Sequence, residues 1–400
     1  MPDFKRRYPF SQMSELGLCP EYDEIRPEEP ITPIIAPYGQ GRAWLAIGFD
    51  EAKAVFASAK LSRHESTTFD VPRPIPFQHG PNVIFSMDNP QHNRLKSLAG
   101  KAFTPKRLNE MRPHIRSIAK ELVADVLDRG GPADLVEAVF LPLPLRVICD
   151  MLGVPYAEQA WFREITERRL AMGDNATMED AVAAHNELDV YFRKMIVDRG
   201  HGSEADLIGA LMLAREGDGD RLSEDELVNL AISLLIGGHE TTASFLGKCL
   251  YLLLSHPDEL AKLRRNPEIL PDAIEECLRF APLSKGPMMP RVAPETMEFQ
   301  GIRLEKGDAI MPDSAAANRD PRVFDCPNQF NITRDRRPHL TFGFGIHHCL
   351  GATLARMELL ETIGELLEAM PALALAQPPA DVVWNERSAS RQPKALHVVW

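Results

Sequence analysis

The segment FGFGIHHCLG, residues 342–351, places one cysteine where a glycine-rich turn leads into a stretch typical of a helix, residues 350–360. A helix that begins here would direct its positive N-terminal end and its unpaired amides toward Cys349 and stabilise a thiolate. Three positions of the turn allow close backbone approach and positive φ angles: Gly343, Gly345 and Gly351. An anionic sulfur on such a bare turn predicts a metal ligand that faces a flat, bulky group.

Three alternative roles for Cys349 fit the sequence less well than metal ligation on a glycine turn. An inert buried cysteine is the common case, but it does not require the surrounding glycines. A zinc site made of His347, His348 and Cys349 is disfavoured, because three consecutive residues cannot easily reach one tetrahedral ion and no CxxC pair completes the set. Covalent c-type haem attachment would need the spacing CxxCH, which the chain lacks.

The same segment resembles the haem-binding loop of the cytochrome P450 family, whose pattern FGxGxHxCxG it matches at every fixed position. The resemblance implies that Cys349 is the axial ligand of a haem b iron and that three further loop residues contact the haem: Phe342, Gly343 and Gly351. For the whole chain it implies a mainly α fold with small β-sheets, in which the haem lies between a long central helix and the cysteine loop.

The most apolar part of the chain, residues 222–254, suggests a membrane span at first sight. Ser223 and Glu226 form a capping box, however, which is typical of a helix start in a soluble domain. Three polar side chains inside the segment would be costly in lipid: His239, Glu240 and Lys248. We therefore expect a long helix through the protein core.

The middle of this helix carries the sequence GGHETT, residues 237–242. Each glycine weakens a helix by roughly 1 kcal/mol, so the pair predicts a local widening or a close contact. The polar groups either satisfy one another in a kinked core helix or form a proton route. The motif resembles the central-helix motif of the P450 family, which implies that Thr241 stabilises bound dioxygen, that Glu240 helps to supply protons and that Gly238 lies against the haem.

A third motif is Glu276-Cys277-Leu278-Arg279, whose two charges lie three apart on one face of a predicted helix. An ordinary surface ion pair would explain an isolated ExxR. Its distance before the cysteine loop resembles the structural clamp of the P450 family, which implies that Glu276 and Arg279 stabilise the fold. Gln329 stands where the family often has an arginine, so the third partner of the clamp is left undetermined.

Haem carboxylates need cations, because burying two propionates without partners would be expensive. By the same resemblance, four residues are the candidates: His92, Lys96, Arg291 and His347. Lys96 stands where arginine is common, and an ammonium offers a point charge in place of a bidentate fork. A histidine such as His92, taken alone, is more often a capping or packing residue.

Composition limits the possible classes of protein. The chain has 400 residues, an evenly spread apolar fraction of 44% and no Gly/Ser linker, which favours a single large domain, residues 1–400. Six cysteines without framework spacing, together with a basic N-terminus that no apolar segment follows, indicate a cytoplasmic protein. A net charge of −12 argues against nucleic-acid binding. The eight basic residues between Gln91 and Lys120 predict either a solvated helix face or a docking patch.

Periodicity predicts a β-rich edge over about residues 25–65, with a hairpin between Ile31 and Ile47, and a helical core over about residues 90–285. Helices are expected near 106–128, 157–171, 177–199, 204–215, 223–254, 257–265 and 271–280. Strands are expected again between 297 and 310 and between 395 and 400.

Motifs between residues 87 and 358 follow the order of the P450 family, so the resemblance covers essentially the whole chain. It implies a soluble bacterial haem-thiolate monooxygenase, expected to be a monomer, that oxidises a small natural product with dioxygen. No fused reductase is expected, so electrons would come indirectly from NAD(P)H through a ferredoxin reductase and a ferredoxin. The ferredoxin is expected to dock near four basic residues: Lys101, Lys106, Arg107 and Arg356.

Substrate contacts are expected from the variable segments of the family, and the candidates are Leu235, Gly238, Leu283, Met288 and Met289. Lys285 and Arg387 could hold a carboxylate but are more typical of solvated surface. Oxidative phenol coupling on the same haem is the alternative reaction. A peroxide-driven enzyme and a catalytically inactive recruitment scaffold are further alternatives, which the combination of Cys349, Glu240 and Thr241 argues against.

Overall fold

The computed structural model describes residues 4–10, 16–74, 78, 80–170, 177–203, 206–216, 222–287, 289–386, 388 and 390–400. The backbone forms two compact units, and each combines separate stretches of the chain. The sheet unit contains Met1–Asn93 and Glu275–Cys349, and the helical unit contains Arg94–Ile274 and Leu350–Trp400. The unit boundary falls within two helices, α3 (Gln91–Gly100) and α11 (Leu270–Phe280). That the chain acts as a single domain stays a prediction.

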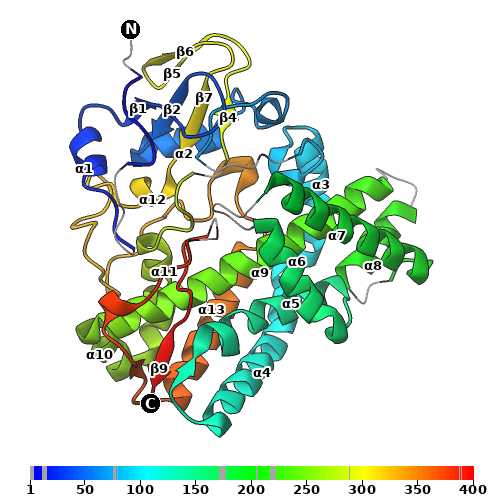
Figure 1. Ribbon diagram of the computed structural model, residues 1–400, viewed down its shortest axis with the longest axis vertical. Helices are drawn as coiled ribbons and strands as arrows, with labels where there is room; N and C mark the ends of the chain where they lie inside the picture. The colour runs from blue at the N-terminus through cyan, green and yellow to red at the C-terminus, as the bar shows by residue number, and fades with distance from the viewer. Residues whose placement is uncertain are drawn as a thin grey trace. The chain divides into compact units, whose positions relative to one another are not determined.

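The sheet unit is organised around a four-stranded sheet in the order β1-β2-β7-β4 (Figure 1). Its strands are β1 (Ile31–Ile34), β2 (Ala43–Ala46), β7 (Ala309–Pro312) and β4 (Arg291–Val292). β1 pairs with β2 in antiparallel register, which confirms the predicted hairpin. β2 pairs in parallel with β7, so residues that are far apart in the sequence become neighbours.

Both faces of this sheet are covered, as the burial of every residue in β2 requires. Side chains alternate between the faces of a strand, so Trp44 and Ala46 join one apolar cluster and Ala43 and Leu45 join the other. The first cluster includes residues of α2 (Phe49–Ala57), a helix that the sequence patterns did not predict within the β-rich edge. The remaining elements of the unit are α1 (Glu21–Ile25), α12 (Ser314–Ala317), β5 (Met297–Phe299) and β6 (Ile302–Leu304).

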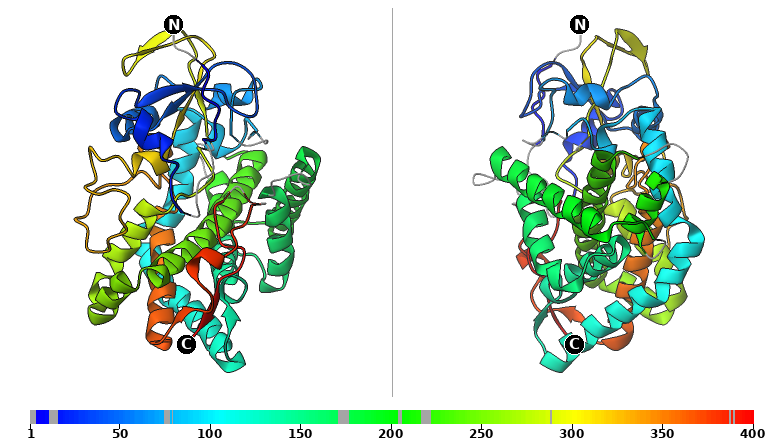
Figure 2. Two further views of the ribbon diagram at one scale, coloured as in Figure 1. Left: turned by 60° about the vertical axis from the view of Figure 1, so that its left-hand side comes forward. Right: turned by 90° about the vertical axis from the view of Figure 1, so that its right-hand side faces the viewer.

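The helical unit contains the long helices of the chain. They are α4 (Pro105–Arg129), α5 (Pro142–Leu152), α6 (Gln159–Leu170), α7 (Met178–Arg199), α8 (Leu207–Glu216), α9 (Glu224–Ser255), α10 (Pro257–Arg265) and α13 (Ala352–Ala369). α13 packs against α4 and α9, and both views of Figure 2 show it in orange beside α4 in cyan. A small sheet in the order β3-β9-β8 joins Ala133–Asp134, His397–Val399 and Ala374–Leu375. The fold is mainly helical with small sheets, as predicted.

α9 confirms the expected core helix and its start. Ser223 caps the helix, and the backbone amide of Ser223 donates in turn to the Glu226 carboxylate at 2.8 Å. The same carboxylate forms an ion pair with Arg94. The glycine pair marks a close contact, because a Cβ on Gly238 would lie 3.1 Å from Cδ1 of Ile148 in α5. Among the described residues, no helix is long and apolar enough to cross a membrane.

Candidate functional site

The predicted site residues divide between the two units, and each group is described within its own unit. The cysteine turn, residues 342–351, belongs to the sheet unit as far as Cys349. Gly343 and Gly345 have φ angles of 70° and 73°, a region that favours glycine. The amide of Cys349 donates to the carbonyl of Phe342 at 2.9 Å, which closes the turn and leaves the cysteine exposed.

Gly345 is constrained by space as well as by backbone angle. A Cβ at this position would lie 3.0 Å from the carbonyl oxygen of Phe56 and 3.1 Å from Cα of Ala57. Those atoms belong to backbone, which cannot rotate away as the end of a flexible side chain can. After the turn, Gly351 takes the N-cap position of α13, so the predicted helix begins three residues after the cysteine.

The sheet unit also contains three of the four predicted propionate partners. Arg291 is 2% exposed and donates to the carbonyls of Val55 at 2.9 Å and Phe56 at 3.1 Å. Burial lowers the pKa of Arg291 to about 10, and the charge of Asp88 raises it in part. The rings of His92 and His347 lie 4.0 Å apart between centroids. The fourth partner, Lys96, is half-buried and lies four residues after His92 in α3.

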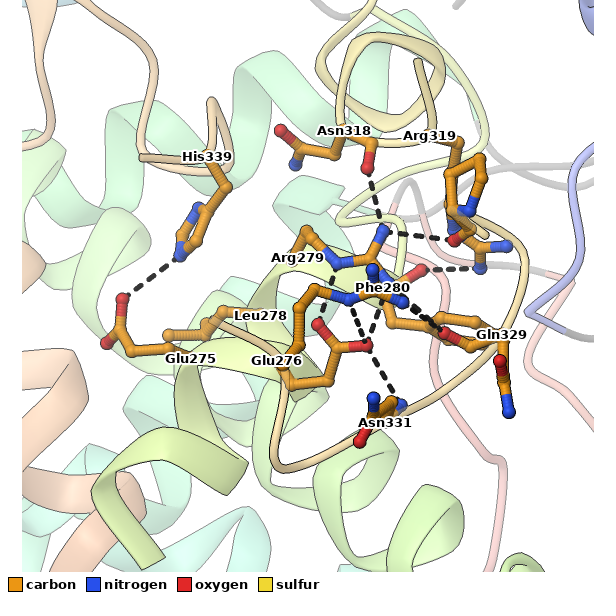
Figure 3. Close-up of polar contacts among 12 residues, drawn as sticks. Glu275, Glu276, Leu278, Arg279, Phe280, Asn318, Arg319, Gln329, Asn331 and His339 are labelled. Carbon is orange, nitrogen blue, oxygen red and sulfur yellow. Dashed lines mark hydrogen bonds and ion pairs between the residues drawn. The ribbon is translucent and has the colours of Figure 1, made fainter. Parts of the chain in front are cut away.

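The ExxR motif forms a buried ion pair (Figure 3). Arg279 donates from Nε to Glu276 at 2.7 Å and from Nη2 to the same carboxylate at 2.8 Å. Nη1 of Arg279 donates to the carbonyl of Asn318 at 2.8 Å. The partner that Gln329 left undetermined is Arg334, whose Nε lies 3.3 Å from the Glu276 carboxylate. Gln329 contributes its backbone carbonyl, which accepts from Arg334 at 2.9 Å.

The helical unit holds the predicted proton-handling residues in the middle of α9. Glu240 is 9% exposed, and the hydroxyl of Ser388 donates to its carboxylate. Burial raises the pKa of Glu240 to about 7; the Ser388 hydrogen bond and the charge of Lys248 lower it, and Glu167 raises it. A carboxyl with this pKa can both take up and release a proton near neutral pH.

The neighbours of Glu240 have local partners on the same unit. The hydroxyl of Thr241 donates at 2.6 Å to the carbonyl of Gly237, one turn earlier in α9. His239 is buried, and its Nδ1 lies 3.2 Å from the hydroxyl of Thr166. Burial lowers the pKa of His239 to about 4, so this ring is neutral at neutral pH.

The substrate candidates differ in what they can offer a ligand. Leu235 is 0% exposed and packs within the helical unit, so it presents no surface to a ligand there. Gly238 faces Ile148, while Leu283 and Met289 are half-buried. Met288 and Arg387 lie outside the described residues. No group of three or more metal-binding side chains occurs in the part of the chain that the structure describes.

Three residues with polar contacts escaped the sequence patterns: Arg334, Ser388 and Arg63. Arg334 lies five residues beyond the position that the family pattern points to. Ser388 lies 148 residues after Glu240, and no local pattern relates the two residues. Arg63 is 8% exposed, and its Nη1 donates to the carbonyl of Phe85 at 2.9 Å.

The donor set fits a haem in chemical terms. An exposed cysteine on a glycine turn offers a thiolate ligand, and buried Arg291 offers donors and positive charge for a carboxylate. Cys349 belongs to the sheet unit and Glu240 to the helical unit, so each unit carries one part of the predicted chemistry.

Comparisons with known proteins agree with this donor set. A family profile described as cytochrome P450 matches residues 174–372. The nocardicin C N-oxygenase of Nocardia uniformis subsp. tsuyamanensis is 40% identical over 396 residues, which cover 99% of this chain and 98% of that protein. The mycinamicin IV hydroxylase/epoxidase of Micromonospora griseorubida is 38% identical over 395 residues, or 99% of this chain and 98% of that protein.

Solved structures agree over the whole length. The cytochrome P450 hydroxylase of the leinamycin biosynthetic pathway of Streptomyces atroolivaceus superposes with a TM-score of 0.91 at 38% identity, over 99% of this chain and 100% of that one. A cytochrome P450 with biaryl coupling reactivity gives 0.92 at 39% identity, over 99% and 100% of the two chains. The predicted enzyme class, a monooxygenase that needs haem iron and reducing electrons, is confirmed. This chain belongs to the cytochrome P450 family.

Proposed function

We propose that this protein is a haem b monooxygenase of natural-product biosynthesis, in which the thiolate of Cys349 would bind the iron. The observation that carries the proposal is the exposed cysteine on a turn with two positive φ angles, directly before α13. A thiolate-bound haem iron supplies the activation of dioxygen with two external electrons. Relatives named as an N-oxygenase and as a hydroxylase/epoxidase support oxidation of a small organic molecule.

Residues of the cysteine turn and of the sheet unit would bind and orient the haem. Gly343 and Gly351 add no side chain to the turn, and the ring of Phe342 would pack against the haem. Arg291, His92 and His347 would hold the propionates, with Lys96 of α3 as a further cation. A charge-assisted hydrogen bond to a carboxylate is about twice as strong as a neutral one, so a buried guanidinium is well suited to this task.

The middle of α9 would handle protons. Glu240 would hold and release the protons that dioxygen reduction consumes, because its raised pKa keeps part of the population protonated near pH 7. The hydroxyl of Thr241 would take part in this proton route, and its hydrogen bond to the carbonyl of Gly237 orients the side chain. Gly238, which packs closely against Ile148 of α5, would lie beside the haem.

The electron donor would be a ferredoxin, reduced by a ferredoxin reductase that takes its electrons from NAD(P)H. The proposed docking residues are Lys101, Lys106, Arg107 and Arg356, all in the helical unit. Arg112 and Arg116 form ion pairs with Glu361, and they serve as controls. Reversing the charge of Lys106 should slow reduction at low salt, and reversing that of Arg116 should not. We further propose a monomer in the cytoplasm.

Oxidative phenol coupling is the second candidate reaction. A solved relative at 39% identity is described as having biaryl coupling reactivity, which makes the same outcome reasonable for this chain. The mass of the product separates the two reactions. Insertion of oxygen adds one oxygen atom to the substrate, whereas coupling joins two substrates and removes two hydrogen atoms.

The decisive experiment is the spectrum of the reduced protein with carbon monoxide. Thiolate ligation predicts the red-shifted Soret band typical of this family, and Cys349→His should abolish it. Cys326→Ser is the matched control, because Cys326 is also exposed and has a positive φ of 45° but lies outside the turn. Iron ligated by nitrogen or water alone in the wild-type protein would end the proposal.

A further inference from the structure

Two buried arginine side chains extend from neighbouring backbone positions in the sheet unit. Ser62 and Val292 form an antiparallel bridge with backbone hydrogen bonds of 2.9 and 2.8 Å. The next residues on the same side of this bridge are Arg63 and Arg291, which are 8% and 2% exposed. Like charges at such opposed positions destabilise a protein, so their burial together calls for a negative partner.

The protein itself supplies only one acid to this pair among the described residues. The carboxylate of Asp88 accepts from the hydroxyl of Ser62, from the amide of Arg63 at 2.9 Å and from the amide of His64 at 3.3 Å. These bonds engage a hydroxyl and two backbone amides, not the guanidinium groups. Within the part of the chain that the structure describes, neither Arg63 nor Arg291 forms an ion pair with a carboxylate within 4.0 Å.

Arg63 also has donor capacity that the protein does not use. Its Nη1 donates to the carbonyl of Phe85 at 2.9 Å and to the sulfur of Met289 at 3.6 Å, a weak acceptor. Its Nε is buried without a hydrogen-bond partner among the described residues. Burial lowers the pKa of Arg63 well below its ordinary value, and the charge of Arg291 lowers it further. A bound anion would relieve both costs.

The surroundings of Arg63 indicate what that anion is. The backbone carbonyl of Asp88 accepts from the amide of His92 at 2.9 Å, and the ring of His92 packs on that of His347. Asp88 therefore connects Arg63 to the residues already proposed to hold haem propionates. Lys96 gives this chain one guanidinium fewer than is common in the family, and Arg63 offers one.

We propose that Arg63 and Arg291 together form a carboxylate-binding site, in which Arg63 supplies the second guanidinium. This inference rests on the proposed haem function. The carboxylate is either a haem propionate or an acidic group of the substrate, which Met289 would adjoin. The position of His92 favours the propionate.

The first arm of the test measures how firmly the holoenzyme keeps its haem. Arg63→Gln should accelerate haem transfer to apomyoglobin about tenfold, in line with the loss of a charge-assisted hydrogen bond. Arg63→Lys keeps the positive charge but loses the forked donors of the guanidinium, so its rate of haem transfer should lie between those of the wild type and Arg63→Gln. Propionate bending bands in the resonance Raman spectrum should shift as well. Arg73→Gln is the control, because Arg73 has its own carboxylate partner in Asp70.

The second arm compares ω-imidazolyl-decanoate with its amide by the shift of the Soret band. If the substrate supplies the carboxylate, the wild-type protein should prefer the acid about tenfold and Arg63→Gln should lose that preference. The inference would be overturned if folded Arg63→Gln and Arg63→Lys kept the haem-transfer rate and the acid preference within about twofold of wild type and showed no shift of the Raman bands. A normal carbon monoxide band in the same samples would leave the proposed function standing.

Discussion

The cysteine turn, residues 342–351, and the middle of α9, residues 237–242, hold their reactive groups in opposite ways. The turn presents Cys349 at an exposed position through backbone angles and backbone hydrogen bonds. α9 buries Glu240, and this burial raises the pKa of the carboxyl; the hydrogen bond from distant Ser388 lowers it in part, and the charge of Glu167 raises it. The difference teaches that a metal ligand can be prepared by local geometry, whereas a proton donor needs tertiary surroundings.

The largest effect should come from the clamp that belongs to the same unit as the turn. Glu276→Gln leaves Arg279 buried without its carboxylate and should cost about 3–5 kcal/mol in the free energy of unfolding, measured in denaturant. Glu275→Gln is the control, because the Glu275 carboxylate is less buried and contacts His339 at 3.2 Å. A loss below about 1 kcal/mol would mean that the turn does not depend on the clamp for stability.

The local nature of the turn can be tested at Gly345. Gly345→Ala should cost about 3 kcal/mol, because the substitution combines an unfavourable positive φ with a clash against the backbone of Phe56. Gly307→Ala separates the two causes, since Gly307 also has a positive φ, of 89°, but has open space where the added Cβ would lie. It should cost about 1 kcal/mol. Equal losses in equilibrium unfolding would show that space around Gly345 does not matter.

The burial of Glu240 predicts a pH dependence of stability. Its pKa of about 7 lies above the ordinary value of 4.5, so the native state binds more protons than the unfolded state between these values. Stability should therefore decrease as the pH rises from 4.5 through 7 and then level off. In the wild type the free energy of unfolding should fall by about 3 kcal/mol between pH 5 and pH 8, and Glu240→Gln should abolish this decrease. An unchanged slope in the variant would contradict the raised pKa.

The smallest expected effect is at Ser388, and it tests the contrast between the cysteine turn and the middle of α9. Its hydrogen bond lowers the pKa of Glu240, so Ser388→Ala should raise the midpoint at which the carboxyl C=O band disappears in infrared titration, by roughly half a unit. Ser388→Thr keeps the hydroxyl and should restore the wild-type midpoint. Ser244→Ala, one turn away on α9, serves as the control because its hydroxyl donates to the carbonyl of Arg391. Equal midpoints in all variants would remove Ser388 from the description of this site.

Local patterns could predict much of this fold. The capping box at Ser223 indicated the start of α9, and the hairpin between Ile31 and Ile47 indicated the first strand pair. The parallel pairing of β2 with β7 was out of reach, because no local pattern relates residues so far apart. α2 was missed because its nine residues bury only Phe49, Ala52 and Val55, a helical pattern too short to stand out beside the strands that flank it in the sequence.

The site could be predicted where a residue's neighbours in sequence determine its geometry. The turn around Cys349 is of this kind. Arg334 could not be predicted in place of Gln329, since a long side chain can reach the same carboxylate from several positions of a loop. Leu235 is fully buried, and its contact with substrate stays a prediction, because helical periodicity does not distinguish a face toward a ligand from a face toward another helix.

The carboxylate of Glu226 has two tasks, since it caps α9 through Ser223 and pairs with Arg94 of α3. Fraying of the first turn of α9 should therefore also break the ion pair that links α9 to α3. A double-mutant cycle between Ser223→Ala and Arg94→Gln should show a coupling energy of about 0.5 kcal/mol or more, even though neither side chain is the other's partner. One acidic residue thus makes the ends of two helices cooperative.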